Sequence, residues 1–161
     1  MSDRQRASRV DEALEVIAAL WSGEPVSRDG KFHLQHAELL PRPIARPRIP
    51  IWIGGALRRP GPRARALRWD GACLYRIPDG WEDVTADEVR QLRSDALNRA
   101  ETANPFTIVV GGRVRQDDLP AEERHVPAIA KAGADWWHEY IPPSLSLQQA
   151  RKRIRRGPLS L

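Results

Sequence analysis

Residues 47–55, PRIPIWIGG, decide the fold of this chain, because they form a proline-bounded apolar run that ends in two glycines. Such a run predicts a buried strand over residues 51–55, with a carboxyl end that another group can approach closely. Asp70-Gly71 then turns the chain into a second apolar run, residues 71–76. A strand, a glycine loop, a helix and a further strand are typical of a parallel α/β protein with an anion-holding rim.

The same alternation continues downstream. Apolar segments at 106–112 and 135–141 predict two more strands, and the intervening segments predict helices near 62–68, 85–100, 121–132 and 146–157. The sequence Thr85-Ala86-Asp87-Glu88 is a capping box that opens the second of these helices. Four strand–helix units in series therefore predict a parallel sheet.

Residues 1–50 follow a different pattern. Apolar residues recur at three- and four-residue spacing between Val10 and Trp21, which predicts an amphipathic helix that Ser22-Gly23 ends. Residues 26–34 alternate around Asp29-Gly30 and predict a small hairpin. Four prolines in residues 41–50 predict an extended connector.

Length and composition indicate one ordinary globular domain over residues 1–161. The chain has 161 residues, of which 41% are hydrophobic and 29% charged. No apolar run is long enough to cross a bilayer, and the first residues have no apolar signal core. The single cysteine, Cys73, excludes an internal disulfide framework. We therefore expect a cytoplasmic protein without a membrane partner.

The net charge of +5 raises the question of nucleic-acid binding. Arginine supplies nearly all of the basic charge, and the arginines are spread along the chain among acidic residues. Two local clusters remain, at residues 58–68 and 151–156, for which solvated helix faces are the simpler interpretation. Because no recognition motif accompanies the charge, we expect no nucleic-acid partner.

The segments RVDEALEVIAALWSGEPVSRDGKFHL, LPRPIARPRIPIWIGG, RWDGACLY and AGADWWHEYIPP together resemble the luciferase-like monooxygenases. This is the bacterial-luciferase superfamily of flavin- and deazaflavin-dependent TIM barrels. The resemblance covers nearly the whole chain, from about residue 6 to residue 158. It implies that the chain corresponds to the C-terminal half of a (β/α)8 barrel, whose complete form has about 250 residues.

The resemblance therefore predicts an α/β fold, a partial TIM barrel built as a (β/α)4 half-barrel with parallel strands. Either a longer protein was shortened or this is a natural half-barrel. Four parallel strands cannot close a barrel, and they leave two edges and an inner face open, with one of Trp136 or Trp137 exposed. We expect self-association, as a homodimer, to complete or cover this face.

The candidate cofactor-binding residues lie at strand ends. Bare amides at Gly54, Gly55 and Ala56 before a helix favour an anion, and the resemblance implies the cofactor phosphate there. The alternative is a tight turn that needs glycine. Arg58 is either a phosphate partner or a solvated arginine, and Gly111-Gly112 are a second candidate contact or a simple turn.

No catalytic residue and no metal site can be assigned from the sequence. The histidines lack metal-ligand spacing, and neither a Ser-His-Asp nor a Cys-His arrangement is present. Cys73 fits a small core residue better than a nucleophile. His138 and Glu139 are adjacent in one predicted strand and must face opposite sides, and a solvent-satisfied polar residue is the simpler interpretation of either.

The resemblance implies an oxidoreductase or monooxygenase module that binds a flavin-type cofactor and a small organic substrate. The cofactor is either FMN or an 8-hydroxy-5-deazaflavin coenzyme, and the residues do not decide between them. Because the cofactor carries out the chemistry, the lack of a catalytic triad does not exclude an enzyme. The alternative is a non-catalytic half-barrel remnant that oligomerises and keeps only the phosphate-binding loop.

Overall fold

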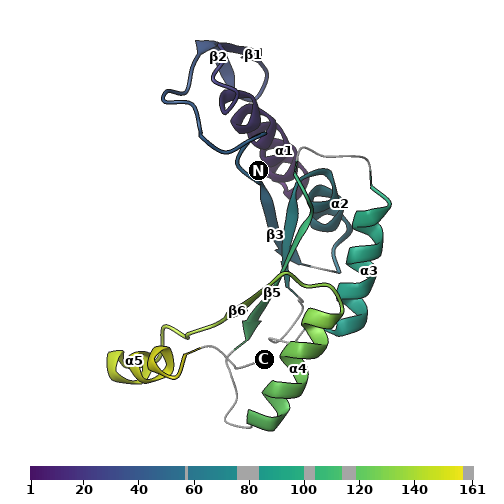
Figure 1. Cartoon of the computed structure of the whole chain (residues 1–161). Coiled ribbons are helices and arrows are strands. Elements are labelled where there is room, and N and C mark those ends of the chain that lie inside the picture. The colour runs from purple at the N-terminus through teal and green to yellow at the C-terminus, as the bar shows by residue number, and fades with distance from the viewer. Residues whose placement is uncertain (57, 76–83, 100–103, 114–118, 158–161) are drawn as a thin grey trace. The chain divides into compact units, whose positions relative to one another are not determined.

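A computed structural model describes residues 1–56, 58–75, 84–99, 104–113 and 119–157 (Figure 1). The chain divides into two compact units. The first comprises Met1–Ile51 with Thr102–Asn104, and the second comprises Trp52–Glu101 with Pro105–Leu161. The assignment of residues 1–161 to one domain stays a prediction.

The first unit contains the predicted amphipathic helix and hairpin. Helix α1, Asp3–Leu20, begins at a capping box in which Ser2 and Gln5 satisfy each other's backbone donors. Strands β1, Val26–Asp29, and β2, His33–Ala37, pair antiparallel. The Glu12 carboxylate of α1 accepts a hydrogen bond of 3.1 Å from the backbone N–H of Phe32 in the hairpin loop, which ties the two elements together.

The second unit contains the predicted series of strands and helices. All four strands are parallel and lie in the order β3-β4-β5-β6, which confirms the predicted sheet. The described strands form part of a (β/α) barrel and do not close. The elements in chain order are β3 Trp52–Ala56, α2 Pro60–Arg68, β4 Gly71–Tyr75, α3 Ala86–Leu97, β5 Thr107–Arg113, α4 Leu119–Lys131, β6 Trp136–Glu139 and α5 Leu147–Arg155.

Local chemistry sets most of the element ends. The predicted capping box is present, since Thr85 accepts from the Glu88 N–H and the Glu88 carboxylate accepts from the Thr85 N–H. Helix α3 ends at Leu97, earlier than the predicted residue 100, because Asn98 hydrogen-bonds back to the carbonyl of Ser94. Helix α2 begins two residues earlier than predicted, at Pro60, whose missing N–H costs nothing at the first helical position.

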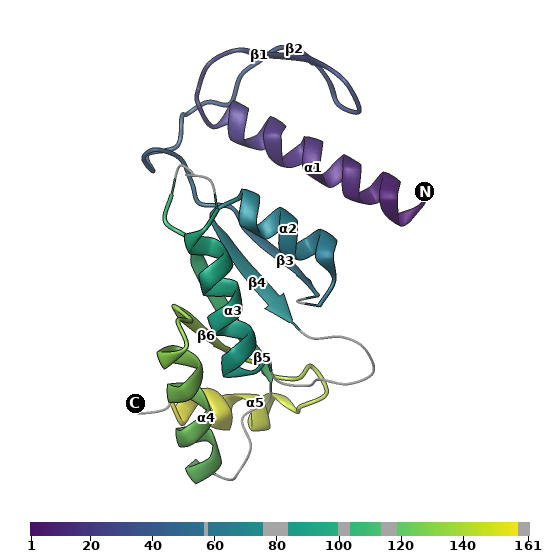
Figure 2. The ribbon, with the colours of Figure 1, turned by 90° about the vertical axis from the view of Figure 1, so that its right-hand side faces the viewer.

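The three helices α2, α3 and α4 lie along one face of the sheet (Figures 1 and 2). Alternation along each strand places small and aliphatic side chains on this face, where they are buried against the helices. Trp137 belongs to the same face, and its ring meets the edge of His125 from α4 at a centroid distance of 5.6 Å. The core of this layer includes Ile53, Ala66, Ala72, Val89, Leu92, Ile108, Val110, Val126 and Ile129.

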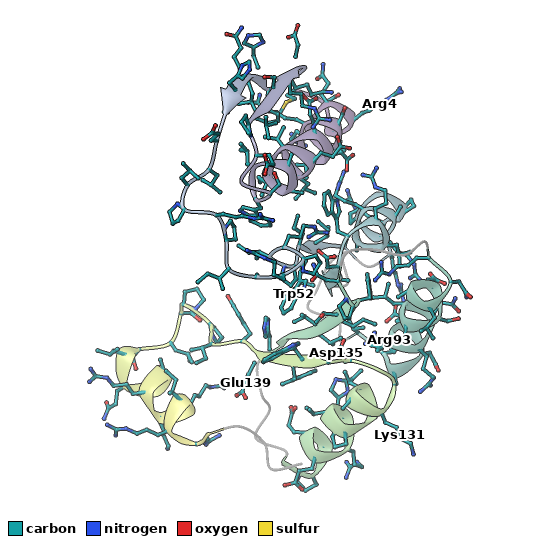
Figure 3. The ribbon with its side chains drawn as sticks, turned by 45° about the horizontal axis from the view of Figure 1, so that its top comes forward. Arg4, Trp52, Arg93, Lys131, Asp135 and Glu139 are labelled. Carbon is teal, nitrogen blue, oxygen red and sulfur yellow. The ribbon has the colours of Figure 1, made fainter. Side chains whose placement is uncertain are left out.

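Arg93 of α3 connects several segments of this layer. Its guanidinium donates hydrogen bonds to the carbonyl oxygens of Phe106 (2.9 Å) and Gly133 (3.1 Å from Nε) and to the Asp135 carboxylate (2.6 Å). Asp135 Oδ2 also accepts from the Ile108 N–H at 2.7 Å. Figure 3 shows Arg93 and Asp135 at this junction. One side chain therefore holds α3, the start of β5 and the turn before β6 together.

An ion pair connects α2 to α3. The Arg63 guanidinium donates to Asp95 Oδ2 at 3.1 Å from Nε, and Gln91 donates to the other carboxylate oxygen at 2.9 Å. These hydrogen bonds, led by the one from Arg63, hold the pKa of Asp95 below its ordinary value. The carboxylate is therefore charged at neutral pH and contributes to helix–helix packing in its charged form.

Candidate functional site

The carboxyl ends of the four strands meet at one edge of the sheet, because all four run parallel. Gly54-Gly55-Ala56 end β3, and Gly111-Gly112 lie near the end of β5. The two glycine pairs therefore share an edge, but β4 lies between their strands. At the usual strand spacing this separates them by about 10 Å, so one phosphate cannot contact both pairs.

Gly54 and Gly55 face opposite sides of the sheet and have different surroundings. A Cβ added at Gly55 would lie 2.5 Å from Cβ of Pro62 in α2, so Gly55 is required for the helix to pack on the strand. Among the described residues, a Cβ at Gly54 would meet only the Cys73 carbonyl oxygen, at 3.9 Å. Of the two glycines, Gly54 is therefore the one whose Cβ position no described side chain fills.

Arg58 lies just beyond β3 and is exposed. Its Nε donates to Glu88 Oε1 at 3.3 Å, and Glu88 also caps the start of α3. Among the described residues this is the hydrogen bond that places the Arg58 guanidinium, and it directs the side chain toward the first turn of α3. That turn lies at the same edge of the sheet because α3 follows β4.

The start of α2 has an unusual shortage of backbone donors. Its first three residues are Pro60, Gly61 and Pro62, and proline has no N–H. The Arg63 N–H already donates to the Arg59 carbonyl. Within the described part of the chain, Gly61 therefore supplies the one unengaged amide of the first turn, and a Cβ there would meet no described atom within 4 Å.

Gly111-Gly112 have a conformational explanation. Gly111 pairs with His138 and Arg113 with Glu139, so Gly112 is the extra residue of a bulge in β5. Gly111 has φ +147°, and a Cβ there would lie far inside van der Waals contact with the His138 carbonyl. The bulge accounts for both glycines without a ligand, and the role of Gly111 and Gly112 in binding stays a prediction.

The sheet face opposite the helices carries exposed aromatic side chains beside the buried Ala56 and Val109. Trp52 is 39% exposed and Trp136 is 58% exposed. Because Trp137 packs against α4, the expectation that one of the two adjacent tryptophans is exposed is confirmed for Trp136. His138 lies on the same face as Trp136, and Glu139 lies on the other. We call the surface formed by Trp52, Gly54, Cys73, Trp136 and His138 the open face.

Cys73 lies on the open face in register with Gly54. Burial raises the pKa of its thiol, so the group is protonated at neutral pH. A protonated, partly buried thiol is a poor nucleophile, which agrees with the interpretation of Cys73 as a packing residue. Sequence alternation could have placed Trp52 beside Gly54 on this face, but it could not tell which glycine faces the helices.

Nowhere in ranges 1–56, 58–75, 84–99, 104–113 and 119–157 do three or more His, Cys, Asp or Glu side chains gather as metal ligands would. Within the same ranges, no helix combines the length and the apolarity needed to cross a bilayer.

A family model of luciferase-like monooxygenases matches residues 1–157. Together with the parallel β/α architecture, this match shows that the chain belongs to the luciferase-like monooxygenase family. It is a luciferase-like oxidoreductase module, and its fold is part of a TIM barrel. No curated protein matches the chain.

The family generally uses flavin or deazaflavin cofactors. Gly54 has no side chain at the carboxyl end of β3, and among the described residues an added Cβ would have one neighbour within 4 Å. Arg58 and Arg59 follow in the chain and are exposed cations, and Gly61 supplies one amide. These residues fit a phosphate group, and the arginine side chains would supply most of the hydrogen-bond donors.

Proposed function

We propose that this chain is the phosphate-binding module of a flavin- or deazaflavin-dependent oxidoreductase that acts on a small organic substrate. In this proposal the cofactor phosphate lies at the carboxyl end of β3, against the backbone of Gly54, Gly55 and Ala56. Arg58 provides the charge-assisted hydrogen bonds. The single observation that carries the proposal is Gly54 at the carboxyl end of β3, where barrel enzymes bind their ligands and where, among the described residues, only the Cys73 carbonyl oxygen approaches the Cβ position.

The residues of this chain would hold and orient the cofactor. Glu88 accepts a hydrogen bond from Nε of Arg58, so an anion would be held by the terminal nitrogens of the same guanidinium. Trp52 and Trp136 on the open face would exclude water from a ring that lies over it. A bound flavin or deazaflavin would supply the redox chemistry that no side chain here provides.

The test of this site uses Gly54 and not Gly55. Replacing Gly55 would push Pro62 away and disturb α2, so a loss of binding there would not identify the site. Gly54→Val adds its side chain where, among the described residues, only the Cys73 carbonyl oxygen lies within 4 Å of the Cβ, so it does not displace α2. We expect Gly54→Val and Arg58→Ala each to weaken binding of FMN or the deazaflavin coenzyme by about tenfold or more, measured by fluorescence titration.

Thr107→Val is the matched control, because it changes the amino-terminal end of β5 and leaves the carboxyl edge intact. It should bind as the unaltered protein does, and all variants should melt cooperatively. If the unaltered chain binds a cofactor and both site variants bind equally well, the assignment to Gly54 and Arg58 is wrong.

A second candidate function is a non-catalytic half-barrel that keeps the phosphate loop alone. The donor-poor start of α2 and the bulge that accounts for Gly111-Gly112 favour it, since both reduce the number of groups dedicated to a ligand. The same titration separates the two candidates. If the unaltered chain binds neither cofactor at millimolar concentration, the non-catalytic function is the better description.

We also propose that two copies associate through the open face. Trp52 and Trp136 are exposed there, and β3 and β6 are the edges of the described sheet. A stable dimer needs about 800 Å² of buried surface from each partner, and large aromatic side chains contribute most per residue. Sedimentation velocity should show a dimer at micromolar concentration and a monomer for Trp136→Glu.

Leu97→Glu is the control for this measurement, because Leu97 is 79% exposed on α3 and lies away from the open face. It should leave the dimer intact. A monomeric unaltered chain, or a dimer that Trp136→Glu does not weaken, would refute association through this face.

A further inference from the structure

The net charge of this chain resides in α5 and the residue that follows it. The chain has 26 Lys and Arg residues against 21 Asp and Glu residues, which gives +5. Residues 147–156 contain five of the cations, Arg151, Lys152, Arg153, Arg155 and Arg156, and no carboxylate. The remainder of the chain is therefore electrically balanced, and the basic character of the protein belongs to one helix.

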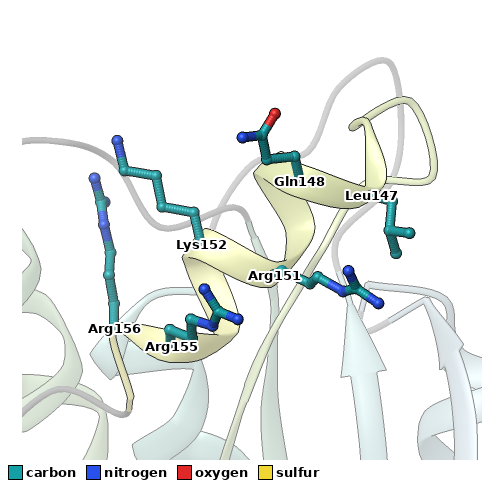
Figure 4. Close-up of a pocket in the computed structure, with 6 residues that line it drawn as sticks. All are labelled: Leu147, Gln148, Arg151, Lys152, Arg155 and Arg156. Atoms are coloured by element: carbon teal, nitrogen blue, oxygen red, sulfur yellow. The ribbon is translucent and has the colours of Figure 1, made fainter.

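The cations on α5 are arranged as two rows of like charge. Arg151 and Arg155 are four residues apart, as are Lys152 and Arg156, so each pair lies on one side of the helix (Figure 4). Like charges at this spacing destabilise a helix unless a counter-charge is present. Within the described part of the chain, Arg151, Lys152 and Arg155 have no carboxylate partner. A cavity of about 750 Å³ runs beside them, bordered by Leu147, Gln148, Arg151, Lys152, Arg155 and Arg156.

An apolar stripe runs along the same helix. Leu147 and Ile154 are seven residues apart, with Ala150 between them, so the three lie on one side. Leu147 is 68% exposed and Ile154 is 65% exposed, and no residue of α5 is buried. Arg151 flanks this stripe on one side and Arg153 on the other. Cations on both sides of an exposed apolar stripe are typical of a helix that lies in a membrane interface.

We propose that α5 binds the surface of an anionic lipid bilayer, with Leu147 and Ile154 inserted among the lipids and the arginines on the headgroups. A nucleic acid would account for the charge and would leave the exposed leucine and isoleucine unexplained. The lipid surface accounts for both. This departs from the expectation of no membrane partner, because the sequence alone did not show that the apolar side of α5 is uncovered. The proposal is independent of the cofactor site.

The test measures binding to vesicles of phosphatidylcholine with and without phosphatidylglycerol. The full chain should bind the anionic vesicles, with binding that falls as salt is added, and should bind neutral vesicles far more weakly. The triple variant Arg151→Gln, Lys152→Gln, Arg155→Gln should lose about a hundredfold in affinity, since each basic residue near such a surface contributes about fivefold.

A matched control removes the same charge elsewhere. Arg4→Gln, Arg124→Gln, Lys131→Gln changes three exposed cations outside α5 and should keep vesicle binding within about threefold. Because α5 has no buried residue, the α5 variants should keep the thermal melt of the unaltered chain. A control that loses as much affinity as the α5 triple variant would show an effect of net charge and overturn the proposal.

The apolar stripe separates a lipid surface from a nucleic acid. Leu147→Ser, Ile154→Ser keeps every cation and should reduce vesicle binding by at least about tenfold. Random duplex DNA is the comparison probe, and its binding should be weaker than vesicle binding at physiological salt. If DNA binds more tightly than the vesicles, or if the serine variant binds vesicles as well as the unaltered chain, α5 is not a lipid-binding helix.

Discussion

Replacing Gly111 with alanine is expected to destabilise the protein by about 3 kcal/mol or more. Gly111 adopts φ +147°, a conformation that residues with a side chain rarely adopt, and its Cβ would collide with the backbone of His138. The colliding atoms belong to the neighbouring strand and cannot rotate away. The free energy of unfolding, measured by urea denaturation, should fall by a large fraction of the 5–15 kcal/mol typical of a domain.

Gly54→Ala is the control for this prediction. Gly54 also lies near the carboxyl end of a strand of this sheet, but among the described residues an alanine Cβ there would have its one neighbour at 3.9 Å. It should change the free energy of unfolding by no more than about 0.5 kcal/mol. Equal unfolding midpoints for the two alanine variants would show that the bulge at residues 111–113 does not constrain the backbone as described.

Arg93→Ala should cost about 2–3 kcal/mol of stability. The change removes the hydrogen bonds to Phe106, Gly133 and Asp135, and it leaves two carbonyls and a carboxylate without their charged donor. Arg93→Lys should recover less than half of the loss, since an ammonium group cannot reach three acceptors as a planar fork does. Thermal and urea unfolding measure both variants.

The comparison for Arg93 is Arg90→Ala on the same helix. Arg90 pairs with Asp87, and the two side chains are 58% and 87% exposed. Such a pair contributes little, so this variant should stay within about 0.5 kcal/mol of the unaltered chain. The account of Arg93 as a junction fails if Arg93→Ala is no more destabilising than Arg90→Ala.

The sequence predicted the order, type and parallel pairing of the strands because these depend on local signals. The apolar run from Pro47 to Gly55 and the Thr85 capping box each act within a few residues, and each was found in its expected place. The junction at Arg93 could not be predicted in this way. Its partners Gly133 and Asp135 are 40 and 42 residues away, so only the folded sheet brings them together.

The candidate site was predicted with less detail. The glycines at residues 54 and 55 were identified as a pair, but their different roles depend on which side of β3 faces α2. Which alternate residues of β3 face α2 follows from the register of β3 against β4, and no single segment specifies that register. The exposure of the apolar side of α5 could not be predicted for a related reason. An amphipathic pattern does not reveal whether another element covers the apolar side of a helix.

The prolines at the start of α2 have a consequence for ligand selectivity. A ring of backbone amides recognises a tetrahedral anion by shape, because its donors are fixed in space. Here Pro60 and Pro62 leave Gly61 as the one amide of the first turn that no described residue engages, and the remaining recognition would depend on the long arginine side chains. A guanidinium donates hydrogen bonds to planar carboxylates and to tetrahedral phosphates about equally well. The carboxyl end of β3 is thus suited to select ligands by charge and position more than by the geometry of the anion itself.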